Sequence, residues 1–202
     1  DLHTRAPSFK MPAHATDCHA HVFGAREKYG WADDRLYTPP PVFLKDYLAM
    51  HDALGVTRGV LTQPSVYGTD NRCMLEYVSA NLHRMRAVVS VDPDVTDKQL
   101  AEMHAQGSRG IRVNVADPGG NPFSSFAEIA RLAECLKPLG WHIEINIAKC
   151  SDWVALEPRL RACPVPLVFD HLGRPRGGEG IDQPGFKVIR RLLSERDDCW
   201  TK

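Results

Sequence analysis

The chain lacks an excess of either charge and lacks any long apolar run. Its 202 residues carry 25 Lys and Arg against 25 Asp and Glu, so net charge gives no electrostatic reason to expect a nucleic acid or an anionic membrane as partner. No apolar stretch approaches the roughly 20 residues that a membrane-spanning helix needs, and the first residues lack the hydrophobic core of a secretory signal. We therefore expect a cytoplasmic protein that acts on a small molecule.

Several familiar motifs are also absent. The six cysteines include no Cys-X-X-Cys pair, which fits reduced, mostly buried thiols better than a disulfide framework or a zinc ribbon. No Gly-X-Gly-X-X-Gly turn follows the first predicted strand, which argues against a dinucleotide-binding sheet. Neither Ser65 nor Ser90 lies in a Gly-X-Ser-X-Gly elbow, so the sequence does not support a serine nucleophile.

What the sequence does contain is a regular alternation of short β-branched runs and longer amphipathic stretches, after a polar lead-in over residues 1–14. The predicted strands are Asp17–Phe23, Arg58–Gln63, Arg86–Asp92, Gly110–Val115, Trp141–Ile147, Pro166–His171 and an opening seventh, Cys199–Lys202. The predicted helices are Pro41–Leu54, Asn71–Leu82, Thr96–Ala105, Ser125–Leu139, Asp152–Cys163 and Gly185–Glu195. Strict strand–helix alternation implies parallel pairing.

This alternation predicts an α/β fold, a (β/α)8 TIM barrel over residues 15–202 that is truncated after about six strand–helix units. Such barrels typically need about 250 residues. An open barrel leaves exposed strand edges, which natural proteins avoid. We therefore expect the native polypeptide to continue beyond Lys202.

Histidines at the two ends of the chain are the first candidate catalytic residues. Alternate side chains of a strand share a face, so Asp17, His19 and His21 are expected to point one way. His171, at the end of the sixth predicted strand, converges on them if both strands belong to one barrel. Three imidazoles so placed bind a metal or polarise a carbonyl. Taken alone, His-X-His fits two solvated or hydrogen-bonded histidines equally well.

The fourth and fifth predicted strands each have a polar face, with Arg112 and Asn114 on one and His142, Glu144 and Asn146 on the other. Branched apolar side chains normally fill a barrel interior. A charged side chain there must be paired, hydrated or bound to a ligand. Arg112 and Glu144 therefore either serve a ligand or neutralise each other as an internal ion pair. For His142, at the start of its strand, we expect a hydrogen-bonded core histidine.

Six segments in order, DCHAHVFG, LYTPPP, GVTRGVLTQPSVYGTDN, RGIRVN, GWHIEIN and FDHLGRP, resemble the amidohydrolase superfamily. The resemblance is to its branch of 2-pyrone-4,6-dicarboxylate lactonases and sugar-lactone hydrolases. It extends from about Asp17 to Lys202 and implies a (β/α)8 barrel that hydrolyses a small carboxylate-bearing lactone with an activated water. Two arginines at strand ends favour an acidic substrate.

The resemblance also implies roles for individual residues. His19, His21 and His171 would surround the scissile carbonyl, and they would either bind a divalent metal or polarise the oxygen without one. The metal would be zinc or manganese, because imidazole is a softer ligand than water or carboxylate, and Glu144 would be a further ligand. The residues whose positions match the binding of substrate carboxylates are Arg112, Arg174, Ser65 and Tyr37, with Arg109 a weaker candidate.

One departure from the family pattern keeps other functions open. The family's water-activating aspartate lies at the end of an eighth strand, and none of Asp17, Asp92 or Asp170 is an obvious replacement. A missing general base typically costs 10²–10⁴-fold in rate. The alternatives are a metal-dependent decarboxylase or a lactone isomerase of the same superfamily, and a non-catalytic truncated barrel. The particular lactone, the metal dependence and a homo-oligomeric state are left open by the sequence.

Overall fold

The computed structural model describes residues 4–116, 122–123 and 126–202. Its parallel sheet has seven strands in chain order. They are β1 (Thr16–Ala20), β2 (Arg58–Thr62), β3 (Met85–Val89), β4 (Ser108–Asn114), β5 (His142–Asn146), β6 (Leu167–Phe169) and β7 (Cys199–Thr201). The α-helices that separate them are α1 (Leu44–Leu54), α2 (Arg72–Ser79), α3 (Asp97–Ala105), α4 (Phe126–Leu136), α5 (Trp153–Arg161) and α6 (Pro184–Glu195).

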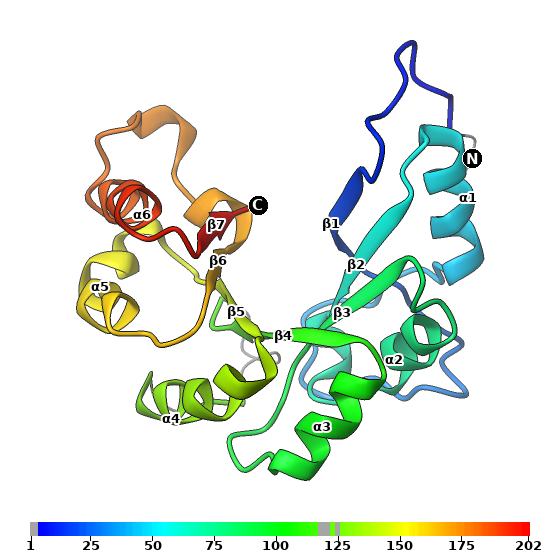
Figure 1. The fold of residues 1–202 in the computed structure, drawn as a ribbon, viewed down its shortest axis with the longest axis horizontal. Coiled ribbons are helices and arrows are strands. Elements are labelled where there is room, and N and C mark those ends of the chain that lie inside the picture. Colours follow the sequence, from blue (N-terminus) through cyan, green and yellow to red (C-terminus); the bar gives the residue numbers. More distant parts are fainter. Residues whose placement is uncertain (1–3, 117–121, 124–125) are drawn as a thin grey trace.

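The sheet is curled, and the helices cover its outer side (Figure 1). In the described part of the chain, β1 and β7 are the edge strands, because each pairs with one neighbour only. The result is an incompletely closed barrel wall built from six strand–helix units and a seventh strand. The predicted fold class is confirmed. None of the described helices is both long and apolar enough to cross a bilayer.

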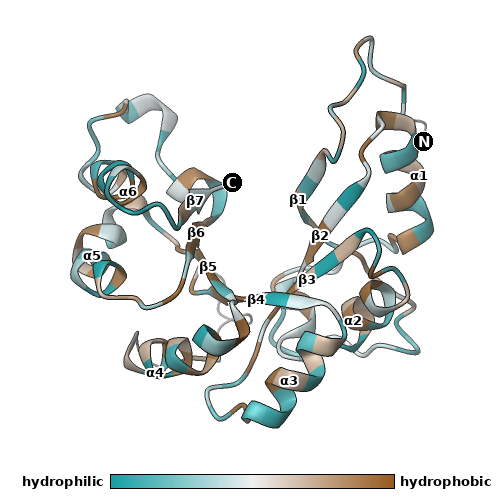
Figure 2. Cartoon of the chain, in the orientation of Figure 1, coloured by the Kyte–Doolittle hydropathy of each residue, from teal (hydrophilic) through white to brown (hydrophobic). Residues whose placement is uncertain are grey.

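The main core lies between the outer face of the sheet and the helices. Ile143, Ile145 and Phe169 on β5 and β6 are at most 1% exposed, and the ring of Phe169 packs edge-on against Trp153 of α5 at 5.1 Å between centroids. Burying each such side chain contributes about 1.5–3 kcal/mol. Hydrophobic and hydrophilic segments alternate along α1 (Figure 2), as expected for a helix that covers a sheet on one side.

Most element boundaries lie near their predicted positions, and local chemistry explains them. Thr96 caps α3 by accepting a hydrogen bond from the Gln99 amide, which satisfies one of the free donors at the helix start. Gly55 ends α1 with φ of 76°, a left-handed conformation that glycine adopts without steric cost. The first helix begins three residues later than predicted, at Leu44, and β1 ends at Ala20 rather than Phe23.

Asp17 does not share the face of the two histidines, so that prediction is wrong. The pairing of β1 with β2 changes register between Asp17 and Ala20. Asp17 Oδ2 accepts a hydrogen bond from the Tyr47 hydroxyl at 3.1 Å and lies 3.3 Å from His51 Nε2. Both partners belong to α1, so the carboxylate faces the helix layer. The strict two-residue alternation of a strand fails where its register is interrupted.

Candidate active site

A pair of histidines marks the carboxyl end of β1. The His19 and His21 Nε2 atoms are 3.4 Å apart, and His21 Nδ1 lies 2.7 Å from the carbonyl oxygen of Thr62 at the end of β2. A carbonyl oxygen only accepts, so His21 Nδ1 carries a proton and its Nε2 presents a lone pair to His19. Burial lowers the pKa of His21 to about 4. His21 is therefore neutral at pH 7, and its tautomer is fixed by Thr62.

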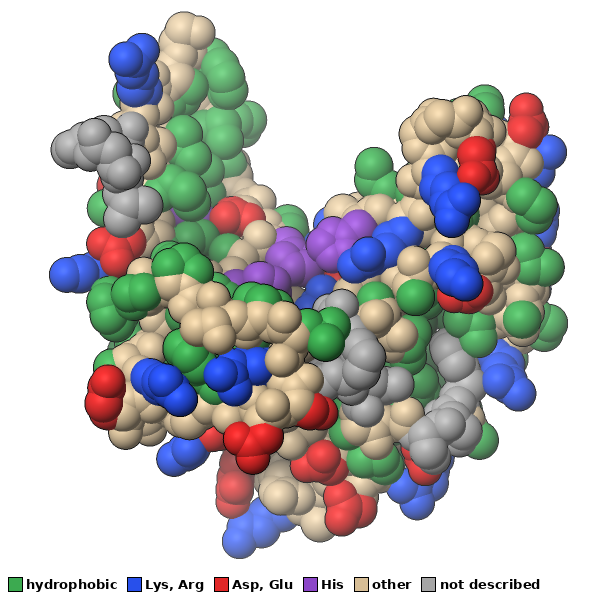
Figure 3. Space-filling model, turned by 180° about the vertical axis from the view of Figure 1, so that it is seen from behind, with side chains coloured by type: hydrophobic (Ala, Val, Ile, Leu, Met, Phe, Trp, Pro, Cys, Tyr) green, Lys and Arg blue, Asp and Glu red, His purple; other side chains and the backbone are tan. Residues whose placement is uncertain are grey.

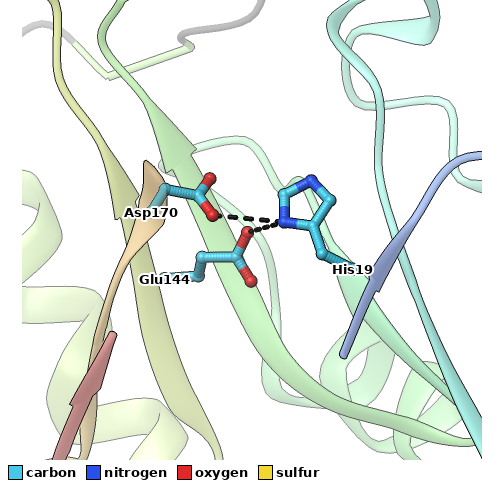
Figure 4. A group of neighbouring side chains, drawn as sticks. All are labelled: His19, Glu144 and Asp170. Atoms are coloured by element: carbon cyan, nitrogen blue, oxygen red, sulfur yellow. Dashed lines mark ion pairs between the residues drawn. The ribbon is translucent and has the colours of Figure 1, made fainter. Parts of the chain in front are cut away.

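Two buried carboxylates face the other side of the His19 ring. His19 Nδ1 is 3.2 Å from Asp170 Oδ1 and 3.6 Å from Glu144 Oε1, and both carboxylate side chains have no exposed surface (Figure 4). Glu144 is on β5, and Asp170 follows the last residue of β6. The site thus joins the first strand to the fifth and sixth. Asp170 was not among the predicted site residues.

Two cations contact this pair of carboxyl groups. Arg112 of β4 donates from Nε and Nη2 to Asp170 Oδ2 at 3.0 and 2.9 Å, and its Nε is 3.4 Å from Glu144 Oε1. Lys202 Nζ is 2.5 Å from Glu144 Oε2 and also donates to the Cys18 carbonyl at 2.8 Å. The expected internal ion pair between Arg112 and Glu144 is present, but Asp170 is the nearer partner. Lys202 was not predicted.

The two carboxyl groups have opposite pKa shifts. Burial, reinforced by the nearby Asp170 charge, raises the pKa of Glu144 to about 8. Burial also acts to raise the pKa of Asp170, but its interaction with His19 and the charge of Arg112 outweigh it and hold that pKa below its usual range. Asp170 is therefore the carboxylate that carries the negative charge most firmly.

His171 completes the cluster of imidazoles. Its ring centroid is 5.6 Å from that of His19, and the His19 and His21 centroids are 5.0 Å apart. His171 is exposed, and burial of part of its ring lowers its pKa. Histidine side chains gather at the base of the hollow between the two arms of the molecule (Figure 3). The structure therefore brings together the three histidines that the sequence singled out.

The predicted substrate-binding residues fall in different places. Arg174 follows His171, and its Nε donates to Asn146 Oδ1 at 3.0 Å. Ser65 is buried and lines a small hollow together with Arg112. Tyr37 is 44% exposed in the segment between β1 and α1. Arg109 donates to the carbonyls of residues 104 and 108 at the amino end of β4, the opposite end from the histidines.

The donor atoms that fit a metal ion differ from the expected set of His19, His21, His171 and Glu144. His19 Nδ1 and one oxygen each from Glu144 and Asp170 lie within 4.8 Å of one another. Glu144 Oε1 is buried and accepts no hydrogen bond from any described residue. One imidazole and two carboxylates form a donor set suited to zinc or manganese. Of the expected ligands, only His19 and Glu144 belong to this group.

Parallel strands curled into a barrel wall, with histidines, carboxylates and an arginine near their carboxyl ends, define a (β/α)-barrel protein with a polar site in the usual position. The amidohydrolase family model matches residues 16–202. The chain therefore belongs to the amidohydrolase family, as the resemblance predicted.

Named relatives are similar over nearly all of this chain. It is 33% identical over 196 residues to 2-pyrone-4,6-dicarboxylate hydrolase from Comamonas testosteroni, which covers 97% of this chain and 64% of that protein. It is 34% identical over 191 residues to 4-sulfomuconolactone hydrolase from Hydrogenophaga intermedia, covering 95% and 63%. A crystal structure of a probable 2-pyrone-4,6-dicarboxylic acid hydrolase from Acinetobacter baumannii with citric acid bound superposes with a TM-score of 0.79, at 27% identity, covering 93% and 69%. The chain thus spans just under two thirds of the length of the two curated relatives.

Proposed function

We propose that the complete protein hydrolyses a small lactone bearing acidic groups, by attack of an activated water on the ring carbonyl. The observation that carries the proposal is the cluster of His19, His21 and His171 around one point at the strand ends, facing Asp170 and Glu144. Two curated relatives at 33% and 34% identity are named 2-pyrone-4,6-dicarboxylate hydrolase and 4-sulfomuconolactone hydrolase. We also propose that residues 15–202 belong to one barrel domain and that residues 1–14 are a lead-in.

The imidazoles supply hydrogen-bond donors for the carbonyl oxygen as negative charge develops on it. His21 cannot turn its Nδ1 proton to the substrate, because Thr62 holds it, so it acts by orienting His19. His171 is exposed just after the carboxyl end of β6, and it is the imidazole that approaches the substrate from the side of that strand. The family resemblance implies a water-activating aspartate at the end of an eighth strand.

The acidic groups of the substrate would be held by Arg174, Ser65 and Tyr37. The Nε of Arg174 is fixed by Asn146, which leaves the planar guanidinium aimed for a bidentate contact with a carboxylate. Arg112 is committed to Asp170 through two hydrogen bonds. We therefore propose that Arg112 mainly positions Asp170. It can contact the substrate only through Nη1, the nitrogen that does not bind Asp170.

A divalent ion held by His19, Glu144 and Asp170 would polarise the carbonyl and lower the pKa of a bound water. However, the two carboxyl groups already have Arg112 and Lys202 as cationic neighbours. A further double positive charge would leave this buried cluster with an excess of positive charge, which is costly in a low-dielectric site. We propose that the protein's own cations and imidazoles provide the electrostatic stabilisation.

The test is hydrolysis of 2-pyrone-4,6-dicarboxylate, 4-sulfomuconolactone and a set of aldonolactones by the full-length protein, before and after treatment with a chelator. We expect turnover that survives chelation and falls about 10²–10³-fold in His171→Ala, as for loss of one oxyanion donor. Activity lost on chelation and restored by zinc or manganese would assign a metal to the donor set. A folded full-length protein that opens no lactone would contradict the proposal, and release of carbon dioxide from these acids would support the decarboxylase alternative.

A further inference from the structure

A pocket of about 700 Å³ lies beside His171, between the segments that follow β5 and β6. Its lining includes His171, Arg174, Lys149, Ser151, Arg176 and Glu179. A volume of this size falls in the range of small-molecule sites. His171 borders both this pocket and the histidine cluster, so a ligand whose carbonyl lies at the histidines has room to extend into the pocket.

The walls of this pocket carry an excess of positive charge. Three cations line it against one carboxylate, and that carboxylate, Glu179, is paired with Arg176 at 3.1 Å. Among the described residues, neither Lys149 nor Arg174 has an acidic partner. Basic side chains lie next to the histidines on this side of the hollow (Figure 3). Two uncompensated cations in one concave pocket attract an anionic group.

We propose that Lys149 joins Arg174 in binding an acidic substituent of the lactone, a carboxylate or a sulfonate, remote from the scissile carbonyl, and that Lys149 sets the preference for substrates that carry it. This inference rests on the proposed function. Arg174 supplies the planar, fixed donor, since Asn146 already holds its Nε. Lys149 adds a mobile point charge that suits either acid.

A change at Glu179 should affect ligand binding in the opposite direction from a change at Lys149. Its carboxylate occupies one nitrogen of Arg176 and opposes the binding of an anion. Removing the Lys149 charge must therefore weaken binding of the acidic substituent, whereas neutralising Glu179 must strengthen it. A merely structural role for these side chains would produce losses in both variants.

The first experiment compares 2-pyrone-4,6-dicarboxylate with 2-pyrone-4-carboxylate and 2-pyrone-6-carboxylate, using full-length wild-type protein and variants. For Lys149→Met we expect KM for the diacid and for one monoacid to rise about tenfold, the size of one charge-assisted hydrogen bond, with kcat little changed. The other monoacid is unaffected. Lys149→Arg keeps most of the affinity, Glu179→Gln lowers KM for the diacid, and the control Lys98→Met, on the exposed face of α3, changes nothing. A Lys149→Met variant that treats all three substrates as the wild type does would overturn the inference.

A second experiment separates this inference from the proposed function. Pyridine-2,4-dicarboxylate has a similar ring with two carboxylates and no lactone bond, so its binding can be measured by calorimetry without turnover. We expect about tenfold weaker binding to Lys149→Met and unchanged binding to Lys98→Met. Equal binding to both variants would overturn the role of Lys149 even if lactones are hydrolysed. Absence of hydrolysis, with the calorimetric difference intact, would overturn only the lactonase proposal.

Discussion

Asp170 contacts charged or ionisable side chains from two other strands of the site. It accepts two hydrogen bonds from Arg112, whose exposure is 5%, and it faces His19. Replacing it by Asn removes the charge but keeps the shape, so the buried guanidinium loses its counter-ion. An uncompensated buried charge costs about 3–5 kcal/mol.

We therefore expect Asp170→Asn to lower the free energy of unfolding by about 3 kcal/mol and to reduce turnover severely. Urea denaturation at pH 7 measures the first effect. The matched control is Asp182→Asn, because Asp182 pairs with Lys187 in an exposed position and should change stability by less than about 1 kcal/mol. Equal losses of stability in the two variants would show that the buried pair of Asp170 and Arg112 stabilises the protein no more than an exposed ion pair does.

His21 should make stability depend on pH in a defined window. Its folded pKa is about 4 against an ordinary 6.5, because burial disfavours the charged ring. Between these values the unfolded chain binds a proton that the folded chain does not, so the free energy of unfolding falls as pH decreases from 6.5 to 4.

Substituting His21→Asn should remove this contribution, which is on the order of 3 kcal/mol over the window. The measurement is chemical denaturation of both proteins at several pH values, with the difference between them plotted against pH. His142, whose pKa burial also lowers to about 4, is present in both proteins and cancels. A difference that stays constant with pH would refute the assignment.

At the level of single residues, the sequence predicted the three histidines and the polar faces of the fourth and fifth strands, but not Asp170. In a regular strand, neighbouring side chains lie on opposite faces. If His171 faces the barrel interior, Asp170 is expected to face away from the site. The chain in fact leaves the strand after Phe169, and His171 adopts φ of 52°. Both neighbours therefore reach the site. Only the combination of an inward Arg112 with the need for a buried counter-charge could have indicated Asp170.

At the level of elements, the pairing of β4 with β5 includes a glycine opposite a histidine. Gly110 pairs with His142 across the two strands, and a Cβ at Gly110 would lie 2.5 Å from the His142 ring. Because Gly110 has no side chain, the His142 imidazole fits against the backbone of β4 at this position. His142 is partly buried, whereas its sequence position predicted a hydrogen-bonded core histidine.

Gly110→Ala should therefore destabilise the protein by about 1–3 kcal/mol through overpacking, measured by thermal or urea unfolding. Gly177→Ala is the matched control, since a Cβ there meets no atom within 4 Å, and it should stay within about 0.5 kcal/mol of wild type. The double variant Gly110→Ala, His142→Ala should regain part of the loss. If the double variant is no more stable than Gly110→Ala alone, the strain does not arise from the contact with His142.

Strand and helix types were predictable because the apolar runs alternate in period along the whole chain. The residues at which the elements begin and end were less predictable. The start of α1 was placed at Pro41, a residue typical of a first helical turn, but Asp46 accepts a hydrogen bond from the Phe43 amide and starts the helix later. The register change in β1 has no signature in residue type at all, and it decided the face of Asp17.

At the level of the whole molecule, Lys202 joins the two edge strands of the described sheet. Its ammonium contacts Glu144 of β5 and the Cys18 carbonyl of β1. We expect Lys202→Met to destabilise the full-length protein by about 3 kcal/mol above pH 8, where Glu144 is ionised and is left buried without its nearest cation.

A double-mutant cycle with Glu144→Gln, measured above pH 8, where Glu144 is ionised, determines the energy of this interaction. The double variant Lys202→Met, Glu144→Gln should be more stable than the sum of the single losses predicts, with a coupling energy of about 1–3 kcal/mol. Strict additivity would mean that Lys202 does not support Glu144 in the folded protein.

The contact between Lys202 and Cys18 joins residues 184 positions apart in the sequence, and this bears on the order of folding. Contacts of such long range form late, because a long loop must close before they contribute. The helices and neighbouring strand pairs are local and form first. During refolding, helical signal should therefore return before the histidine of β1 meets its carboxylates, so the site is among the last parts of the protein to mature.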